Sequence, residues 1–144
     1  MSIDVNKNLV QRLLEGLNGG RLEILDDIVA EDYQQDNASV RGGREGLKAL
    51  FTRLRIAFPD LSVSVDELVG EGDTVVAATT FRGTQDGDLV GIAPTGRRIE
   101  VSSLDLYRVA DGRIAEHFGR FDELGMLDQL GIAHDLTWTG RATG

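Results

Sequence analysis

Residues 103–118 read SLDLYRVADGRIAEHF, and this segment decides the fold expected of the chain. Apolar and polar residues alternate on both sides of Asp111-Gly112, a dipeptide typical of tight hairpin turns. The segment therefore predicts two antiparallel strands joined by a short loop. It also contains His117, one of only two histidines in the chain, and Asp105 on the opposite strand.

Two loop geometries are open for this hairpin, and they give His117 different partners. A three-residue loop at 110–112 places Asp105 directly opposite His117. A two-residue loop pairs His117 with Leu106 and turns the Asp105 carboxylate to the other face. We favour the three-residue loop, in which a carboxylate about 5 Å away can orient the imidazole and raise its basicity. From the pair alone, an acid/base role and a purely structural buried pair are equally open.

Composition limits the classes of protein to consider. With 144 residues and 41% hydrophobic content, the chain suits one domain over 1–144, with a core at about 5–131 and a tail at 132–144. Cysteine is absent, which excludes disulfides and thiolate chemistry. The net charge of −9 opposes binding to nucleic acid. Without a leader or a long apolar run, we expect a cytoplasmic protein with no membrane contact.

Helical periodicity dominates the first third of the chain. Asp4 is a candidate N-cap for a helix that ends at Gly19-Gly20, and a shorter helix follows over about 22–29. The polar residues 32–39 are expected to form a loop. A third helix is expected from about Arg44 to Ala57, before Pro59.

Strand periodicity dominates the rest. Alternation at 61–65 and the β-branched run at 74–81 predict two antiparallel strands joined by a turn at 70–73. A loop follows over 82–98, then the two hairpin strands and a short helix within 122–131. The predicted fold is α+β, a cone-shaped barrel in which three N-terminal helices pack on a curved four-stranded antiparallel sheet, with a short C-terminal helix. Its mouth is expected to enclose a pocket between the sheet and the helices.

The other face of the predicted sheet carries more apolar surface than a monomer usually exposes, namely Leu104, Leu106, Ile114 and Phe118. We expect a homodimer joined through this face. A C-terminal tail folded over the same surface is the alternative.

An ordered series of motifs runs along the chain. It consists of Gly19-Gly20, Asp32-Tyr33 leading to Asp36-Asn37, residues 43–47 (GREGL), and DLYR and DGRIAEH within the hairpin. Over about residues 5–131 this series resembles the SnoaL-like polyketide cyclases. The resemblance implies the cone-shaped fold of the nuclear-transport-factor-two-like superfamily, often dimeric or tetrameric. It also implies activity with neither a metal nor an organic cofactor.

One position departs from the pattern of that family. In the cyclases, an aspartate two residues after the motif histidine is the acid/base for an intramolecular aldol ring closure, and this chain has Gly119 there. The resemblance also extends to proteins that support hydroxylation of anthracycline rings without a bound cofactor. Because Gly119 supplies no base, a hydroxylase of a polycyclic aromatic polyketide is slightly favoured. An aldol cyclase, an acid/base enzyme like ketosteroid isomerase or epoxide hydrolase, and a non-catalytic binding protein are the alternatives.

Candidate site residues follow from the hairpin and the resemblance. His117 is expected to take a phenolic proton while Asp105 orients it. Asp36 is a candidate second acid, although an aspartate beside an asparagine in a loop is more often a turn former. The residues expected to contact a polycyclic substrate are Tyr33, Asn37, Phe51, Phe81, Ser103 and Phe121. The two histidines have no spacing typical of metal ligands, so no metal site is expected.

Overall fold

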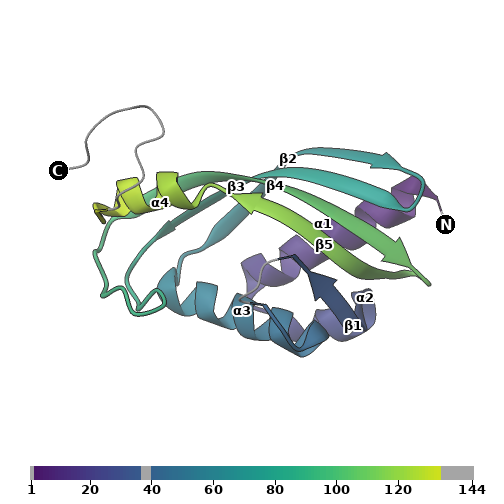
Figure 1. Cartoon of the computed structure of the whole chain (residues 1–144), viewed down its shortest axis with the longest axis horizontal. Helices are drawn as coiled ribbons and strands as arrows, with labels where there is room; N and C mark the ends of the chain where they lie inside the picture. The colour runs from purple at the N-terminus through teal and green to yellow at the C-terminus, as the bar shows by residue number, and fades with distance from the viewer. Residues whose placement is uncertain (1, 37–39, 134–144) are drawn as a thin grey trace.

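A computed structural model of the chain describes residues 2–36 and 40–133. In chain order its elements are α1 (Ile3–Gly19), a 3-10 turn η1 (Leu22–Ile24), α2 (Leu25–Ile28), β1 (Val29–Gln35), α3 (Gly43–Ala57), β2 (Ser62–Glu71), β3 (Thr74–Thr84), β4 (Arg98–Ala110), β5 (Arg113–Phe121) and α4 (Glu123–Leu130). Figure 1 shows the long strands arching over α1, α2 and α3, with α4 at the end where β5 finishes.

The helices begin and end where capping residues stand. Ser2, and not Asp4, is the N-cap of α1, and its side chain accepts a hydrogen bond from the Val5 backbone N–H. Gly20 ends the same helix with a φ of +66°, which glycine adopts without strain. The predicted C-terminal helix is confirmed as α4, which Asp122 caps through the Gly125 N–H.

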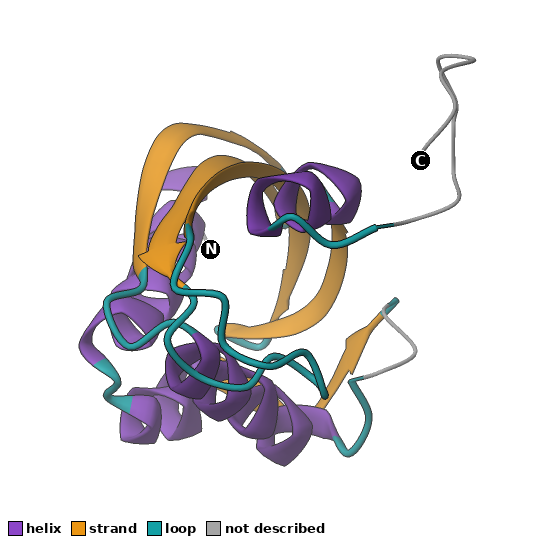
Figure 2. Ribbon diagram, turned by 90° about the vertical axis from the view of Figure 1, so that its left-hand side faces the viewer, coloured by secondary structure: helices purple, strands orange, loops and turns teal. Residues whose placement is uncertain are grey.

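One mixed sheet forms the wall of the fold, in the order β1-β5-β4-β3-β2. The four long strands pair antiparallel and twist strongly, so that the sheet curls round its concave face (Figure 2). The apolar faces of α1 and α3 fill this concave side together with Val75, Ala77, Val101 and Ile114. The predicted α+β cone is confirmed in outline.

The sheet has a fifth strand that the sequence did not predict. Residues 29–35 form β1, which pairs parallel with β5, whereas the polar stretch from 32 was expected to be a loop. β1 lies at the edge of the sheet, and its polar residues Glu31, Asp32 and Gln34 are exposed to water, so their burial is not required. The second helix is shorter than predicted, because Val29 already belongs to the strand.

The hairpin adopts neither of the two expected registers. Its loop has two residues, Asp111 and Gly112, both with positive φ, and Ala110 pairs with Arg113. A β-bulge between Ile114 and Glu116 then shifts the pairing, so that Tyr107 faces His117. The bulge turns His117 to the same face as Asp105, as the favoured register required, but through a different geometry. The two-residue loop pairs Ile114 with the buried Val109, so Ile114 lies in the core and not on the outer face.

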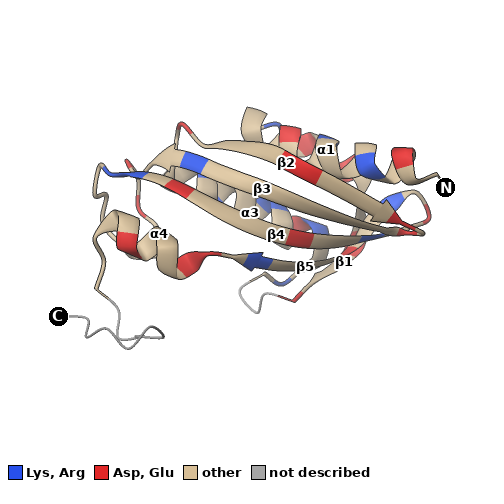
Figure 3. Cartoon of the chain, turned by 90° about the horizontal axis from the view of Figure 1, so that it is seen from above, with Lys and Arg blue, Asp and Glu red and all other residues tan. Residues whose placement is uncertain are grey.

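The convex face of the sheet retains part of the predicted apolar surface. Leu104 and Phe118 are 57% and 44% exposed there. Uncharged residues make up most of the four long strands when this face is viewed (Figure 3). Within the described residues, none of the helices has the length and apolar character needed to cross a bilayer.

Candidate active site

Asp105 and His117 form an ion pair or charge-assisted hydrogen bond on the concave face of the sheet. His117 Nε2 lies 2.8 Å from Asp105 Oδ1. Because of the bulge, the residue directly opposite Asp105 is Gly119, and the carboxylate reaches His117 diagonally. The two side chains are 11% and 13% exposed, so they are largely shielded from bulk water yet still accessible.

Ser103 holds the other carboxylate oxygen. Its hydroxyl donates to Asp105 Oδ2 at 2.8 Å, and both residues are buried on the same face of β4. A carboxylate offers about four acceptor positions, of which these two contacts use one on each oxygen. Asp105 therefore keeps acceptor capacity for a further proton.

Tyr33 binds the second ring nitrogen of His117. The Tyr33 hydroxyl lies 3.0 Å from His117 Nδ1 and donates to Gln35 Oε1 at 2.6 Å. Since its only hydrogen goes to Gln35, Nδ1 donates to Tyr33; with Asp105 ionised, Nε2 donates to Asp105 and the ring is an imidazolium. If the Gln35 amide is reversed, Tyr33 donates to Nδ1 and the ring is neutral. The network has two arrangements that differ by one proton.

In both arrangements His117 Nε2 donates to Asp105 and Nδ1 is occupied by Tyr33. No ring nitrogen is left to accept a proton from a ligand directly. The geometry therefore favours Asp105 as the proton acceptor and His117 as the group that orients it and balances its charge.

Both tyrosines of the chain contact this ring. Tyr107 stacks on His117 with centroids 4.5 Å apart and planes within 4°. Burial raises the pKa of Tyr33 and of Tyr107, with the negative charge of Asp105 as the next cause for both. Both phenols stay protonated at neutral pH, so Tyr33 can donate or accept hydrogen bonds but is not a phenolate base.

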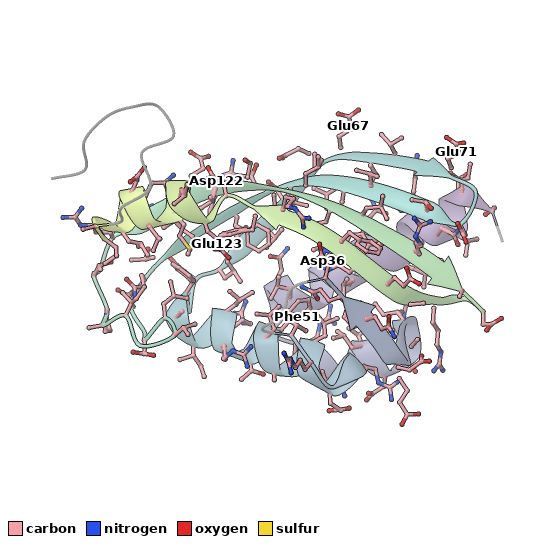
Figure 4. All side chains as sticks on the ribbon, in the orientation of Figure 1. Asp36, Phe51, Glu67, Glu71, Asp122 and Glu123 are labelled. Carbon is pink, nitrogen blue, oxygen red and sulfur yellow. The ribbon has the colours of Figure 1, made fainter. Side chains whose placement is uncertain are left out.

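Asp36 belongs to a different contact. Its carboxylate accepts from Arg120 Nη1 at 2.5 Å and from the Gly119 N–H at 3.2 Å. The hydrogen bond from Arg120 lowers the pKa of Asp36. In Figure 4 Asp36 lies where the end of β1 meets β5. This geometry favours a clamp between the two strands over a second acid, because the carboxyl holds no proton near neutral pH.

The predicted aromatic residues divide into two groups. Phe81 and Phe121 pack edge to face with centroids 5.2 Å apart, and both are partly exposed. Phe51 points from α3 toward the sheet (Figure 4) and is buried in the main hydrophobic core. Asn37 lies outside the described residues.

A hollow of about 850 Å³ adjoins the network on the β1 side. It is lined by residues 31–35 and 40–43, which include Tyr33 and Gln35. The pocket was expected at the mouth of the cone, with Phe51 as one of the residues that contact the substrate, but Phe51 is buried in the core. The volume of the hollow falls in the range of small-molecule sites. Among the described residues, no three acidic or histidine side chains gather as metal ligands do.

Sequence reasoning missed three contributors to this site. Gln35 was missed because β1 was not recognised as a strand. In a strand, residues 33 and 35 lie on the same face, so the Gln35 side chain is beside Tyr33. Tyr107 lies between Asp105 and Val109 on the inward face, a signal present in the alternation of β4. Arg120 has no local signal, since its partner Asp36 is 84 positions away.

The sequence model of a family described as SnoaL-like polyketide cyclase matches residues 7–130. The chain belongs to this family. This SnoaL-like chain is 32% identical over 131 residues to an aklanonic acid methyl ester cyclase, DauD, from Streptomyces sp. (strain C5), covering 86% of this chain and 80% of DauD.

Solved structures agree with the assignment. TsrD from Streptomyces laurentii is 36% identical with a TM-score of 0.86, covering 91% of this chain and 98% of TsrD. AclR from Streptomyces galilaeus, a candidate hydroxylase, is 25% identical with a TM-score of 0.79, covering 90% of this chain and 98% of AclR. The proteins similar to this SnoaL-like chain thus include one named as a cyclase and one named as a candidate hydroxylase.

Proposed function

We propose that this protein is an acid/base enzyme that closes a ring in a polycyclic aromatic polyketide, with Asp105 as the base. The observation that carries the proposal is the linked network from Ser103 through Asp105 and His117 to Tyr33. It presents a carboxylate with spare acceptor capacity that is linked through His117 to Tyr33, and Tyr33 lines a hollow of suitable size whose lining does not include Asp105 or His117. The relatives named as cyclases support this class of reaction.

The proposed reaction conserves every atom of the substrate. Asp105 takes a proton from a carbon next to a carbonyl, and the resulting enolate carbon bonds to a ketone carbon of the same molecule. The alkoxide formed there takes the proton back from the Asp105 carboxyl. His117 donates to Asp105 throughout and, as imidazolium, stabilises the negative charge that develops. Phe81 and Phe121 offer an apolar surface for a ring system, and Asn37 is retained as a candidate hydrogen-bonding partner.

Hydroxylation of a polyketide ring is the second candidate. The sequence favoured it because Gly119 stands where the cyclases have their acid/base aspartate. However, Asp105 Oδ1 lies 2.3 Å from the position that a Cβ at Gly119 would occupy. A carboxylate is therefore available at that place, and the main reason to prefer hydroxylation is removed. The similarity to AclR is the observation that keeps this candidate.

Incubation with aklanonic acid methyl ester, analysed by liquid chromatography and mass spectrometry, separates the possibilities. A product of unchanged mass and altered retention indicates ring closure. A product heavier by one oxygen atom indicates hydroxylation. Substrate that binds and is recovered unchanged indicates a binding protein and contradicts the enzymatic proposal.

The Asp105→Asn variant tests the role of the carboxylate. It keeps the shape of the side chain and removes the base, so we expect turnover to fall by about 10²-fold or more with little change in KM. Glu71→Gln, which removes a carboxylate at the far end of the sheet (Figure 4), is the matched control and should be unaffected.

Two further variants test the neighbouring residues. His117→Ala should fold and lose activity, and Asp36→Asn should keep most of the activity. Full turnover in Asp105→Asn would exclude Asp105 as the base.

We also propose that the protein forms a homodimer through the convex face of the sheet, where Leu104 and Phe118 are exposed. The alternative, a C-terminal tail over this face, concerns residues 134–144, which lie outside the described part. A cytoplasmic location stays an expectation from the sequence.

A further inference from the structure

Gly119 leaves the space in which the Asp105–His117 pair forms. A Cβ at this position would lie 2.3 Å from Asp105 Oδ1 and 2.9 Å from His117 Nε2. Both distances are well inside van der Waals contact, so the carboxylate and the imidazole occupy the volume of a side chain at 119. The backbone around Gly119 is ordinary extended strand, and no positive φ calls for glycine there. The absence of a side chain is therefore explained by the pair.

We propose that Gly119 is a positioning residue that allows β4, and not β5, to supply the carboxylate of the site, and that residues 105 and 119 form an exchangeable pair. This inference rests on the proposed function of Asp105. The inference goes beyond that function by stating that a side chain at position 119 and the Asp105–His117 contact exclude each other.

Covalent geometry supports exchange between the two positions. In an aspartate, the bonds of about 1.5 and 1.2 Å place each carboxylate oxygen about 2.4 Å from its own Cβ. Asp105 Oδ1 lies 2.3 Å from the Cβ position of residue 119. An aspartate introduced at 119 can thus place an oxygen where Asp105 Oδ1 now lies, within reach of His117 Nε2, once the Asp105 side chain is removed.

The test compares four variants: Asp105→Ala, Gly119→Ala, Gly119→Asp, and the double variant Asp105→Ala with Gly119→Asp. Asp105→Ala removes the carboxylate, and Gly119→Ala displaces it from His117, so each should lose about 10²-fold in turnover or more. Gly119→Asp alone crowds a second carboxylate into the pair and should also be impaired. The double variant should turn over at least about tenfold faster than Asp105→Ala, a coupling between neighbouring sites that independent changes do not give.

A measurement without substrate keeps this inference separate from the proposed function. The ring resonances of His117, assigned by NMR with His134→Gln, report the hydrogen bond between Nε2 and the Asp105 carboxylate directly. We expect these resonances to shift in Asp105→Ala and Gly119→Ala and to return toward their original positions in the double variant. If no polyketide is turned over but this pattern holds, the proposed reaction fails and the positioning role of Gly119 stands.

Thermal unfolding provides the control for folding. Gly119→Ala should lower the Tm of the original chain more than it lowers the Tm of Asp105→Ala, because the atom that Cβ approaches most closely is then absent and only the contact with His117 Nε2 remains. Unchanged His117 ring resonances in Gly119→Ala would overturn the inference. So would a double variant with neither restored His117 resonances nor a gain in turnover over Asp105→Ala.

Discussion

At the scale of single residues, the site depends on neutral phenols around one imidazole. Tyr33 accepts or donates at Nδ1 of His117, and Tyr107 covers the ring face. Stacking therefore fixes the plane of the His117 ring, and hydrogen bonds occupy both of its nitrogens. Asp105 is the member of the network that still has acceptor positions for a ligand. Because neither tyrosine ionises near neutral pH, the tyrosines act on His117 only through hydrogen bonding and stacking, and do not exchange charge with it.

Tyrosine ionisation gives a direct check on this burial. The folded-state pKa of Tyr33 and of Tyr107 is raised above the unfolded value of about 10, so both contribute stability below that pH and lose it as the pH rises further. Absorbance at 295 nm should therefore show neither phenol ionising separately. Both should titrate together with the loss of circular dichroism, at a pH above about 10. Ionisation of a tyrosine in the folded protein would contradict the buried network.

At the scale of elements, the packing of α3 against β1 depends on close approach of backbones. A Cβ at Gly46 would lie 1.8 Å from the Arg41 carbonyl oxygen, and one at Gly43 would lie 2.3 Å from the Glu31 carbonyl oxygen. The first turn of α3 thus sits against its own preceding loop and against β1 without side chains between them. This contact fixes the helix beside the strand that carries Tyr33.

The Gly46→Ala variant tests that contact against helix propensity. Propensity alone predicts a gain of up to about 1 kcal/mol for alanine within a helix. The clash with a backbone carbonyl predicts the reverse, a loss of about 1–3 kcal/mol in the free energy of unfolding measured with urea. Gly19→Ala near the end of α1 is the control, because its Cβ would meet only the flexible Arg21 side chain at 3.3 Å. A stabilised Gly46→Ala would show that the contact is looser than described.

Elements with a strong period of apolar residues could be predicted from the sequence, whereas elements that depend on pairing with a distant strand could not. The helix over Gly43–Ala57 and the long strands follow from local patterns of apolar residues. β1 was missed because an edge strand needs little apolar surface, so its sequence resembles a loop. The bulge at Ala115 has no local sequence signature. It is needed because a two-residue loop alone would turn His117 to the outer face of the sheet. The pairing of Asp105 with His117 was expected from their places on facing strands, but the space that Gly119 leaves for this contact is seen only in the structure.

At the scale of the whole molecule, the convex face of the sheet carries exposed apolar side chains on two of its strands. Leu104 and Phe118 come from adjacent strands and lie on the same face. An isologous contact between two copies of this face would remove them from water without involving the concave site. The site and the proposed dimer surface therefore lie on opposite sides of one sheet.

The Phe118→Lys variant tests this surface. Size-exclusion chromatography with light scattering should give twice the mass of one chain for the original protein and a single chain for the variant, because a buried lysine charge opposes association. Val90→Lys is the matched control, since Val90 is 83% exposed but lies in the loop between β3 and β4. A monomer for the original protein would contradict the dimer.

The bond between Tyr33 and His117 joins positions 84 residues apart. The strand carrying the imidazole is the last one made during synthesis, and it must dock beside the first before the phenol has its partner. A growing chain on the ribosome, or a fragment cut before residue 113, has no such bond, whatever helices it has already formed. The hydrogen-bond network is thus among the last parts of the protein to assemble, and the activity proposed for it requires β5 to be complete.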